Sequence, residues 1–209
     1  MIMVDQRQAP TTARSRQQIK SSEMRRRICE ATTHCLATLG YPNTSIKQVI
    51  QTAGISQGAL QHHFPSKEDL VTATATFLLR RSIKWFTQIK AELEKDRSAF
   101  GKVTQRSWAD QFATEEYEAL LQILVASRTD ATLKTRIAPK LEDWREAIES
   151  EMRDLLTPIA RDADELNALL TIGRCMMTGL LVHDGLLDDE ERIETVIEAW
   201  IDIVAKASR

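Results

Sequence analysis

Four polar or small residues near position 60 have the types and spacing that contact with the edges of DNA bases would need. They are Gln57, Gly58, Gln61 and His62. A spacing of one or four positions gathers such residues on one side of a short helix. A glutamine amide can pair with adenine through two hydrogen bonds, and an imidazole can donate to or accept from a base or a phosphate. The pattern therefore favours recognition of DNA over catalysis.

Start and stop signals on both sides predict two short helices that would hold these residues. Ser45 and Gln48 fit a capping box, and Gly54 can adopt the left-handed conformation that ends a helix. Ser56 caps the second helix and Pro65 stops it. Apolar residues of the first helix recur on one face: Ile46, Val49, Ile50 and Ala53. Two short helices joined by a glycine turn describe a helix-turn-helix, whose second helix enters the major groove.

Residues at the edges of this unit are candidates for phosphate contacts. Lys67 falls in the first turn of a further helix, where positive charge and free backbone amides both favour a phosphate. The alternative is that these side chains are merely solvated. The DNA-contacting residues that we expect are Thr44, Ser45, Ser56, Gln57, Gly58, Gln61, His62, His63 and Lys67.

Charge is divided unevenly along the 209 residues. Residues 1–70 hold nine Lys and Arg against five Asp and Glu, whereas residues 71–209 hold nineteen against twenty-five. This asymmetry predicts that the front of the chain meets a polyanion. Residues 1–22 lack apolar periodicity, so we expect a flexible basic arm there, followed by a DNA-binding domain over 23–70 and a larger domain over 71–209.

Composition favours an all-α protein that is not an enzyme. Only seven Gly and five Pro occur, and neither strand-like alternation nor a catalytic signature such as GxSxG or HExxH is present. The three cysteines form no CxxC, so we expect no metal, no cofactor and a reduced, cytoplasmic protein, with Cys175 buried. No apolar run suggests a signal peptide or a membrane span.

Short motifs with fixed spacing fill residues 24–70. They are Gly40-Tyr41, Thr44-Ser45-Ile46, Ala53-Gly54-Ile55-Ser56, Gly58-Ala59-Leu60 and His63-Phe64-Pro65-Ser66-Lys67-Glu68-Asp69-Leu70. With these motifs the stretch resembles the DNA-binding domain of the TetR family of transcriptional regulators. Two positions depart from the family pattern: Gln61 stands where an aromatic residue is usual, and Ile50 stands where a small residue is usual.

The larger domain reads as a series of helices that could enclose a small molecule. Aromatic, methionine and charged residues at helical spacing are candidates for its lining, although such residues are more often simple core. The candidates are Trp85, Trp108, Phe112, Arg128, Trp144, Met176, Met177 and His183.

The last two expected helices, 163–187 and 189–207, carry apolar stripes broad enough to be covered on two sides. The family resemblance implies that they form a four-helix interface in a homodimer. The interface residues that we expect are Leu180, Leu181, Ile193, Val196, Ile197, Trp200, Ile201 and Val204.

These features together predict a homodimeric repressor that binds a near-palindromic operator in double-stranded DNA and is released by a small-molecule effector. Two copies would read two half-sites, which multiplies affinity and specificity. One alternative is a DNA-binding regulator without such an effector, either constitutive or controlled by a protein partner. A remote alternative is a helical interaction module or an enzyme.

Overall fold

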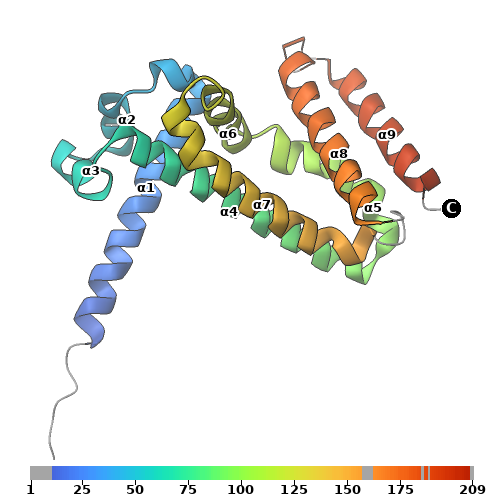
Figure 1. Cartoon of the computed structure of the whole chain (residues 1–209), viewed down its shortest axis with the longest axis horizontal. Helices are drawn as coiled ribbons and strands as arrows, with labels where there is room; N and C mark the ends of the chain where they lie inside the picture. The colour runs from blue at the N-terminus through green and yellow to red at the C-terminus, as the bar shows by residue number, and fades with distance from the viewer. Residues whose placement is uncertain (1–10, 157–161, 185, 188, 208–209) are drawn as a thin grey trace, which may run out of the picture.

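The computed structural model describes residues 11–156, 162–184, 186–187 and 189–207. All regular elements within these ranges are helices, which confirms the prediction of an all-α fold (Figure 1). They are α1 Thr11–Asn43, α2 Ile46–Ala53, α3 Gln57–His63, α4 Lys67–Lys95, a 3-10 turn Arg97–Ala99, α5 Phe100–Ser107, a π-helical turn Trp108–Phe112, α6 Glu115–Ala126, α7 Ala131–Leu156, α8 Ala163–His183 and α9 Glu190–Ala207.

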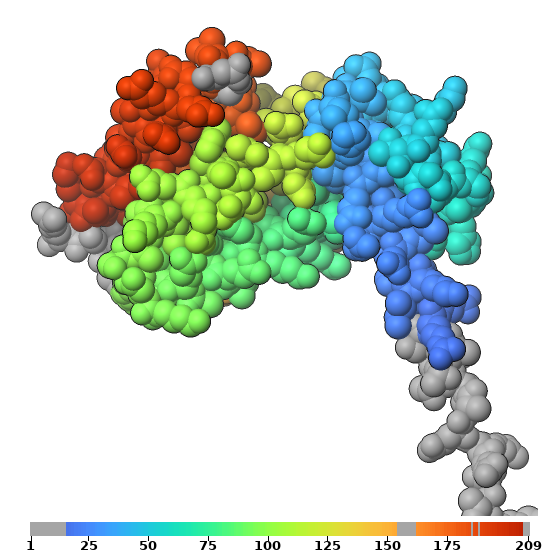
Figure 2. Space-filling model, turned by 180° about the vertical axis from the view of Figure 1, so that it is seen from behind, coloured from blue at the N-terminus to red at the C-terminus, as the bar shows by residue number. Residues whose placement is uncertain are grey.

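The first helix begins earlier than its apolar pattern predicts. Periodicity indicated a start near Ser22, whereas α1 begins at Thr11 and projects away from the body (Figures 1 and 2). The prediction of a flexible arm over 1–22 is therefore corrected for residues 11–22, and residues 1–10 lie outside the described part. Arg, Gln and Lys are good helix formers even without an apolar stripe, so they extend a helix that is already nucleated. Gly40, with φ 75° and ψ 164°, ends the regular part of α1.

The core of the DNA-binding unit is small and includes residues of α4. Its buried apolar side chains come from four helices: Ile28, Cys29, Ala31, Cys35, Val49, Ala53, Leu60, Phe64 and Leu70. Leu70 lies in α4, so the unit closes its core with a helix that also belongs to the larger domain. A core this small needs that extra helix for stability.

The long helix α4 connects the two ends of the molecule. Its first half packs with α6 and α7 through a core that includes Val71, Leu78 and Ile123. Its second half contributes Ile89 and Leu93 to a separate core with residues of α5, α7 and α8. Figure 1 shows α7 running alongside α4 over much of its length.

Helices α8 and α9 lie at the end of the molecule opposite the DNA-binding unit (Figures 1 and 2). The segment Ala163–His183 is long and apolar enough to cross a membrane by length and composition, with mean hydropathy 1.2, although sequence inspection predicted no such run. Only 17% of its apolar window is buried within this chain. Cys175, expected to be buried, is exposed on this helix.

We predict that Phe64→Ala lowers the free energy of unfolding by about 3–5 kcal/mol, because Phe64 is 2% exposed and few side chains could refill its space. Urea unfolding followed by circular dichroism measures the change. Phe64→Leu serves as the control and should cost clearly less, since it keeps most of the apolar volume. Equal stability of Phe64→Ala and the native protein would contradict this account of the core.

Candidate DNA interface and ligand cavity

Local hydrogen bonds fix the start of both helices in the helix-turn-helix. The Ser45 side chain accepts from the Gln48 amide at 3.4 Å, and Gln48 Oε1 accepts from the Ser45 amide at 2.8 Å, so the expected capping box is present. Gly54 adopts φ 60° and ψ 47° and turns the chain after α2. The Ser56 hydroxyl accepts from the Ala59 amide at 3.2 Å and caps α3.

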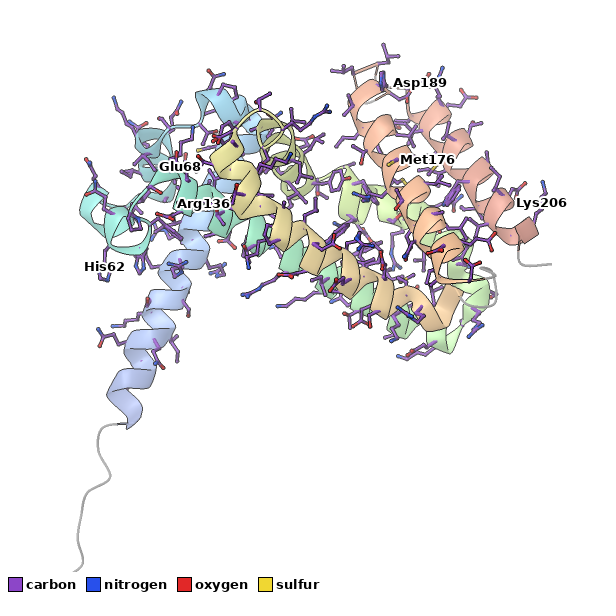
Figure 3. All side chains as sticks on the ribbon, in the orientation of Figure 1. His62, Glu68, Arg136, Met176, Asp189 and Lys206 are labelled. Atoms are coloured by element: carbon purple, nitrogen blue, oxygen red, sulfur yellow. The ribbon has the colours of Figure 1, made fainter. Side chains whose placement is uncertain are left out.

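The outer side of α3 carries the residues that were expected to face DNA. Leu60 is 1% exposed and fixes the inner side of the helix. On the outer side the structure brings together exposed side chains of Ser56, Gln57, Gln61 and His62. Figure 3 shows His62 projecting from α3 away from the body. Gly58 has open space where a side chain would begin, so a DNA strand could approach the backbone there.

The Thr44 hydroxyl is not free to contact DNA, although Thr44 was expected among the DNA-contacting residues. It is 3% exposed, and its hydroxyl donates to the Gly40 carbonyl oxygen at 2.8 Å. Ser45 is exposed, but its hydroxyl donates to Gln48 Oε1 at 2.6 Å. Both hydroxyls therefore stabilise the entry to α2. Sequence reasoning could not separate these capping roles from a phosphate contact, because both use the same hydroxyl chemistry.

Lys67 and His63 lie at the junction of α3 with α1 and α4. The Lys67 ammonium donates to the Tyr41 carbonyl oxygen at 3.3 Å and lies 4.6 Å from the centre of the Tyr41 ring. Burial lowers the pKa of His63, and nearby His62 and Arg25 lower it further, so His63 is neutral at pH 7. A neutral imidazole can still donate a hydrogen bond to a phosphate.

Arg25 holds α1 against the end of α3. Its guanidinium donates to the His63 carbonyl oxygen at 2.9 Å and lies 4.4 Å from the centre of the Phe64 ring. The spacing of residues in the sequence carries no sign of this long-range contact. An open hollow lies between α1 and α3, with walls formed by Gln17, Gln18, Lys20, Ser21, Met24, Ala59, His62 and His63. The helical part of the N-terminal segment thus flanks the recognition helix.

An ion pair joins the first turn of α4 to α7. Arg136 donates to Asp69 at 2.6 Å, while Asp69 also accepts from the Ser66 hydroxyl at 2.7 Å. The hydrogen bond from Ser66 and then that from Arg136 lower the pKa of Asp69, so its carboxylate stays ionised at neutral pH. Figure 3 shows Arg136 next to Glu68 at this junction. This ion pair therefore connects α7 to the turn that follows α3.

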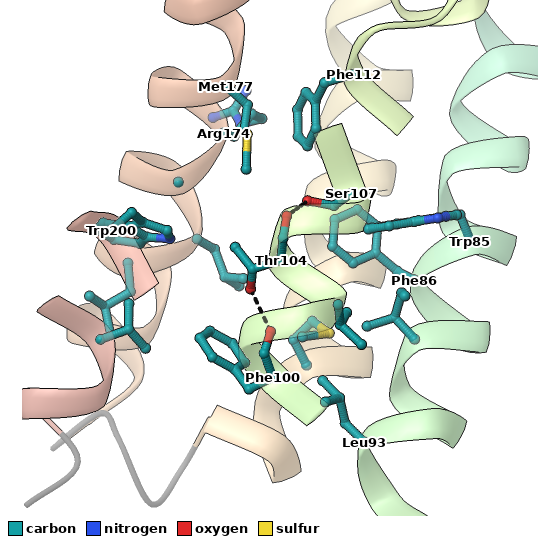
Figure 4. Close-up of a pocket in the computed structure, with 17 residues that line it drawn as sticks. Trp85, Phe86, Leu93, Phe100, Thr104, Ser107, Phe112, Arg174, Met177 and Trp200 are labelled. Carbon is teal, nitrogen blue, oxygen red and sulfur yellow. Dashed lines mark hydrogen bonds between the residues drawn. The ribbon is translucent and has the colours of Figure 1, made fainter. Parts of the chain in front are cut away.

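The larger domain contains a partly open cavity of about 140 Å³ that is lined by residues of α4, α5, α7, α8, α9 and the π-helical turn (Figure 4). Its walls are mainly apolar. Three of the expected ligand residues line it: Trp85, Phe112 and Met177. Sequence reasoning assigned Trp200 and Val204 to the dimer interface, but they line this cavity as well.

A second cavity of about 60 Å³ adjoins the first and is lined partly by Trp144. Phe86, Phe112, Leu170 and Arg174 border both cavities. Sequence reasoning missed Arg174, because one arginine within an apolar helix gives no periodic signal. Its position in the middle of the most apolar segment was the available clue.

Four expected ligand residues are not brought to either cavity. Trp108 packs in the core beside Phe112 without lining the space. Arg128 is exposed just beyond the end of α6. Met176 and His183 border a shallow hollow on the outer side of α8 instead. These residues share helical spacing with the true lining, and periodicity alone cannot tell one helix face from the next.

Most residues expected at a dimer interface pack within this chain. Four of them are at most 6% exposed: Leu180, Ile193, Ile197 and Val204. Leu181, Val196, Trp200 and Ile201 are half-buried. The exposed apolar side chains of α8, α9 and the residues between them are Ile172, Val182, Leu186, Leu187 and Ile203. The stripes thus pack among α5, α8, α9 and the π-helical turn, and other residues face outward.

Sequence comparisons agree with this geometry. Residues 28–74 match the family model described as bacterial regulatory proteins, tetR family. An uncharacterized HTH-type transcriptional regulator of Mycobacterium tuberculosis is 32% identical over 179 residues, covering 86% of this chain and 91% of the relative. The HTH-type transcriptional repressor AcnR of Corynebacterium diphtheriae is 27% identical over 184 residues, covering 85% and 90%.

Solved structures share the fold. A TetR-family regulator from Rhodococcus sp. has a TM-score of 0.62 at 18% identity, covering 87% of this chain and 98% of that chain. A transcriptional regulator from Saccharomonospora viridis in complex with choline has a TM-score of 0.60 at 23% identity, covering 87% and 96%.

The chain belongs to the TetR family. It is a DNA-binding transcriptional regulator and not an enzyme, as the motifs in residues 24–70 predicted. Regulators of this family bind DNA, function as dimers and bind small molecules. The departure from the family pattern at Gln61 falls on the exposed side of α3.

We predict that Gln57→Ala or Gln61→Ala changes the preferred base at one position of each half-site more than it weakens binding to random DNA. The reason is that an amide reads a base edge, whereas phosphates carry no sequence information. Selection of bound sequences from random DNA measures the change. Gln51→Ala, on the exposed side of α2, is the matched control. Equal losses on all sequences would remove Gln57 and Gln61 from base recognition.

Proposed function

We propose that the chain is a homodimeric repressor that binds a near-palindromic operator and is released by a small molecule in the first cavity, which has a volume of about 140 Å³. The observation that carries this proposal is the position of the cavity against α4. Trp85, Phe86, Ile89 and Leu93 of α4 line it, and the same helix starts directly after the helix-turn-helix. A ligand that fills the cavity would press on the helix that positions α3.

The geometry of the operator makes such a displacement effective. Two recognition helices must be about 34–36 Å apart to dock in successive major grooves. The helix α4 has 29 residues and so extends about 43 Å. A small tilt at the cavity end becomes a shift of several ångströms at the DNA end, which prevents both helices from docking together. A regulator without an effector would need no such cavity.

A second copy of the chain is the best cover for the outer side of α8. The chain leaves Ile172 and Val182 of α8 exposed, at 51% and 44%, and Leu186, just beyond the end of the helix, at 82%. Gly179 on the same helix has open space at its Cβ position, which would let another helix approach closely. The low burial of this apolar helix within one chain has the same explanation.

Named relatives support the finer parts of the proposal. AcnR is described as a repressor, and the regulator from Saccharomonospora viridis holds choline. Family members are regulators of transcription, so we place this protein in the cytoplasm, with double-stranded DNA as its partner.

We predict that the double variant Ile172→Asp and Val182→Asp sediments as a monomer, whereas the native protein sediments at twice the 23.7 kDa of one chain. Two buried carboxylates would oppose burial of this face. Val125→Asp is the matched control, because Val125 is 57% exposed on α6, away from the outer side of α8. A dimer that persists in the double variant would move the interface to another surface.

We predict that the affinity of the dimer for its operator falls with salt. A plot of log K against log salt concentration should have a slope of roughly −5 to −7 if each subunit neutralises three or four phosphates. Lys67→Ala should make this slope shallower by about two, because each of the two subunits loses one phosphate contact, provided that the ammonium turns from Tyr41 to a phosphate. Fluorescence anisotropy of labelled operator at several salt concentrations measures the slope. An unchanged slope would show that Lys67 serves only the junction with Tyr41.

Release is tested by adding fractionated metabolites to the protein–operator complex. The expected result is that at least one fraction raises the operator Kd by about tenfold or more, since coupling between sites is typically about 1–3 kcal/mol per ligand. Operator binding that no fraction weakens would favour a regulator without a small-molecule effector.

A further inference from the structure

Arg174 brings a positive charge to cavities that are otherwise mainly apolar. It lies in the middle of α8, is partly buried and borders both cavities. Figure 4 shows Arg174 and Met177 on α8 across the cavity from Phe112. Among the described residues, the Arg174 guanidinium forms no ion pair and donates no hydrogen bond, while its backbone oxygen accepts from Thr178.

The contact that Arg174 does make leaves its hydrogen-bonding capacity unused. Its Cζ lies 5.7 Å from the centre of the Trp144 ring, near the outer limit of a cation–π contact. An aromatic face offers no lone pairs to the five N–H donors of a guanidinium. Partial burial of such a group is unfavourable unless an acceptor is supplied. A hydrogen-bond acceptor in the cavity, best of all a charged one, would use these donors.

Other polar groups around the second cavity also favour a ligand that accepts hydrogen bonds over one that donates them. Trp144 lines this cavity, and its Nε1 is shielded from solvent yet donates to no group in the described part of the chain. Burial raises the pKa of Tyr117, which keeps its phenol neutral, and the hydroxyl lies 2.5 Å from that of Thr178. Glu149, the acidic residue among the lining, is already paired with Arg145.

The first cavity has room for a small apolar group of a ligand. A cavity of about 140 Å³ is close to the engineered apolar cavity of about 150 Å³ that accepts benzene. Around this space the aromatic residues come from α4, α5, α9 and the π-helical turn: Trp85, Phe86, Phe100, Phe112 and Trp200. These walls suit one ring or a short branched chain, with Arg174 at the boundary with the second cavity.

From these observations we infer that the effector is a small apolar carboxylate, with its body in the first cavity and its carboxylate against Arg174. This inference rests on the proposed function, because it assigns the chemistry of the same ligand. Carboxylate and guanidinium match in a two-bond geometry, which a neutral amide or an alcohol does not reproduce. A cationic ligand is disfavoured, since it would face the unpaired guanidinium.

The test compares matched pairs of charged and neutral compounds in calorimetric titrations of the free, full-length protein. The pairs are phenylacetate with phenylacetamide and hexanoate with hexanamide. The native protein should bind at least one carboxylate about ten- to a hundredfold more tightly than its amide, because a charged hydrogen-bonded pair adds that much. Arg174→Met keeps the length and apolar stem of the side chain, and it should abolish the preference.

Two further variants keep the outcome interpretable. Arg174→Lys keeps the charge and should retain part of the preference even where Arg174→Met folds poorly, as judged by thermal unfolding. Arg106→Met is the control on α5, because Arg106 is exposed and paired with Glu92 and Asp110 outside the cavity. This control should bind the carboxylate as the native protein does.

Several results would overturn the inference. It is wrong if the amides bind as tightly as the carboxylates, if Arg174→Met keeps the preference, or if none of the four compounds binds. Release of operator DNA by metabolite fractions is measured separately. A fraction that releases DNA while the carboxylates fail would leave the proposed function in place and reject only the ligand class.

Discussion

The structure depends on one helix, α4, that joins the core of the DNA-binding unit to the core beside the ligand cavity. Leu70 closes the core of the DNA-binding unit, and Ile89 and Leu93 belong to the core beside the ligand cavity. The DNA-binding unit is too small to hold α3 rigidly without this helix. Sharing one rigid element between two cores means that a change in packing at one end changes the support of α3 at the other.

In the proposed mechanism, the contacts at the start of α4 determine how a shift of α4 at the cavity reaches α3. Ser66 caps the helix through Asp69, and Arg136 of α7 binds the same carboxylate. Two helices that flank the ligand cavity, α4 and α7, therefore meet at the turn that follows α3. From Lys67 to Trp85 the helix extends roughly 27 Å, so the lever is long compared with the displacement it must transmit. Because coupling is reciprocal, the proposed mechanism requires that operator binding weaken effector binding by the same factor.

Features set by neighbouring residues could be predicted from the sequence, and features set by distant contacts could not. The caps at Ser45 and Ser56 and the turn at Gly54 follow from residue types within three or four positions, so α2 and α3 were placed correctly. The helical start at Thr11 carried no apolar pattern. The burial of Thr44 also depends on a fold that local spacing does not describe. Arg174 was missed for the same reason, since a cavity wall is assembled from five helices and a turn.

Different sides of α8 face different surroundings, which explains why its sequence is apolar nearly all round. One side packs against α9 through Leu180, and another lines the cavity through Met177. The remaining side exposes Ile172 and Val182, which water disfavours and a second copy of α8 would cover. Periodicity reports that a residue is to be buried, but not whether its own chain or another chain buries it. A charged residue in the middle of a helix that packs on all three sides is unfavourable unless the charge has a partner. The cavity is the place where Arg174 can bind such a partner.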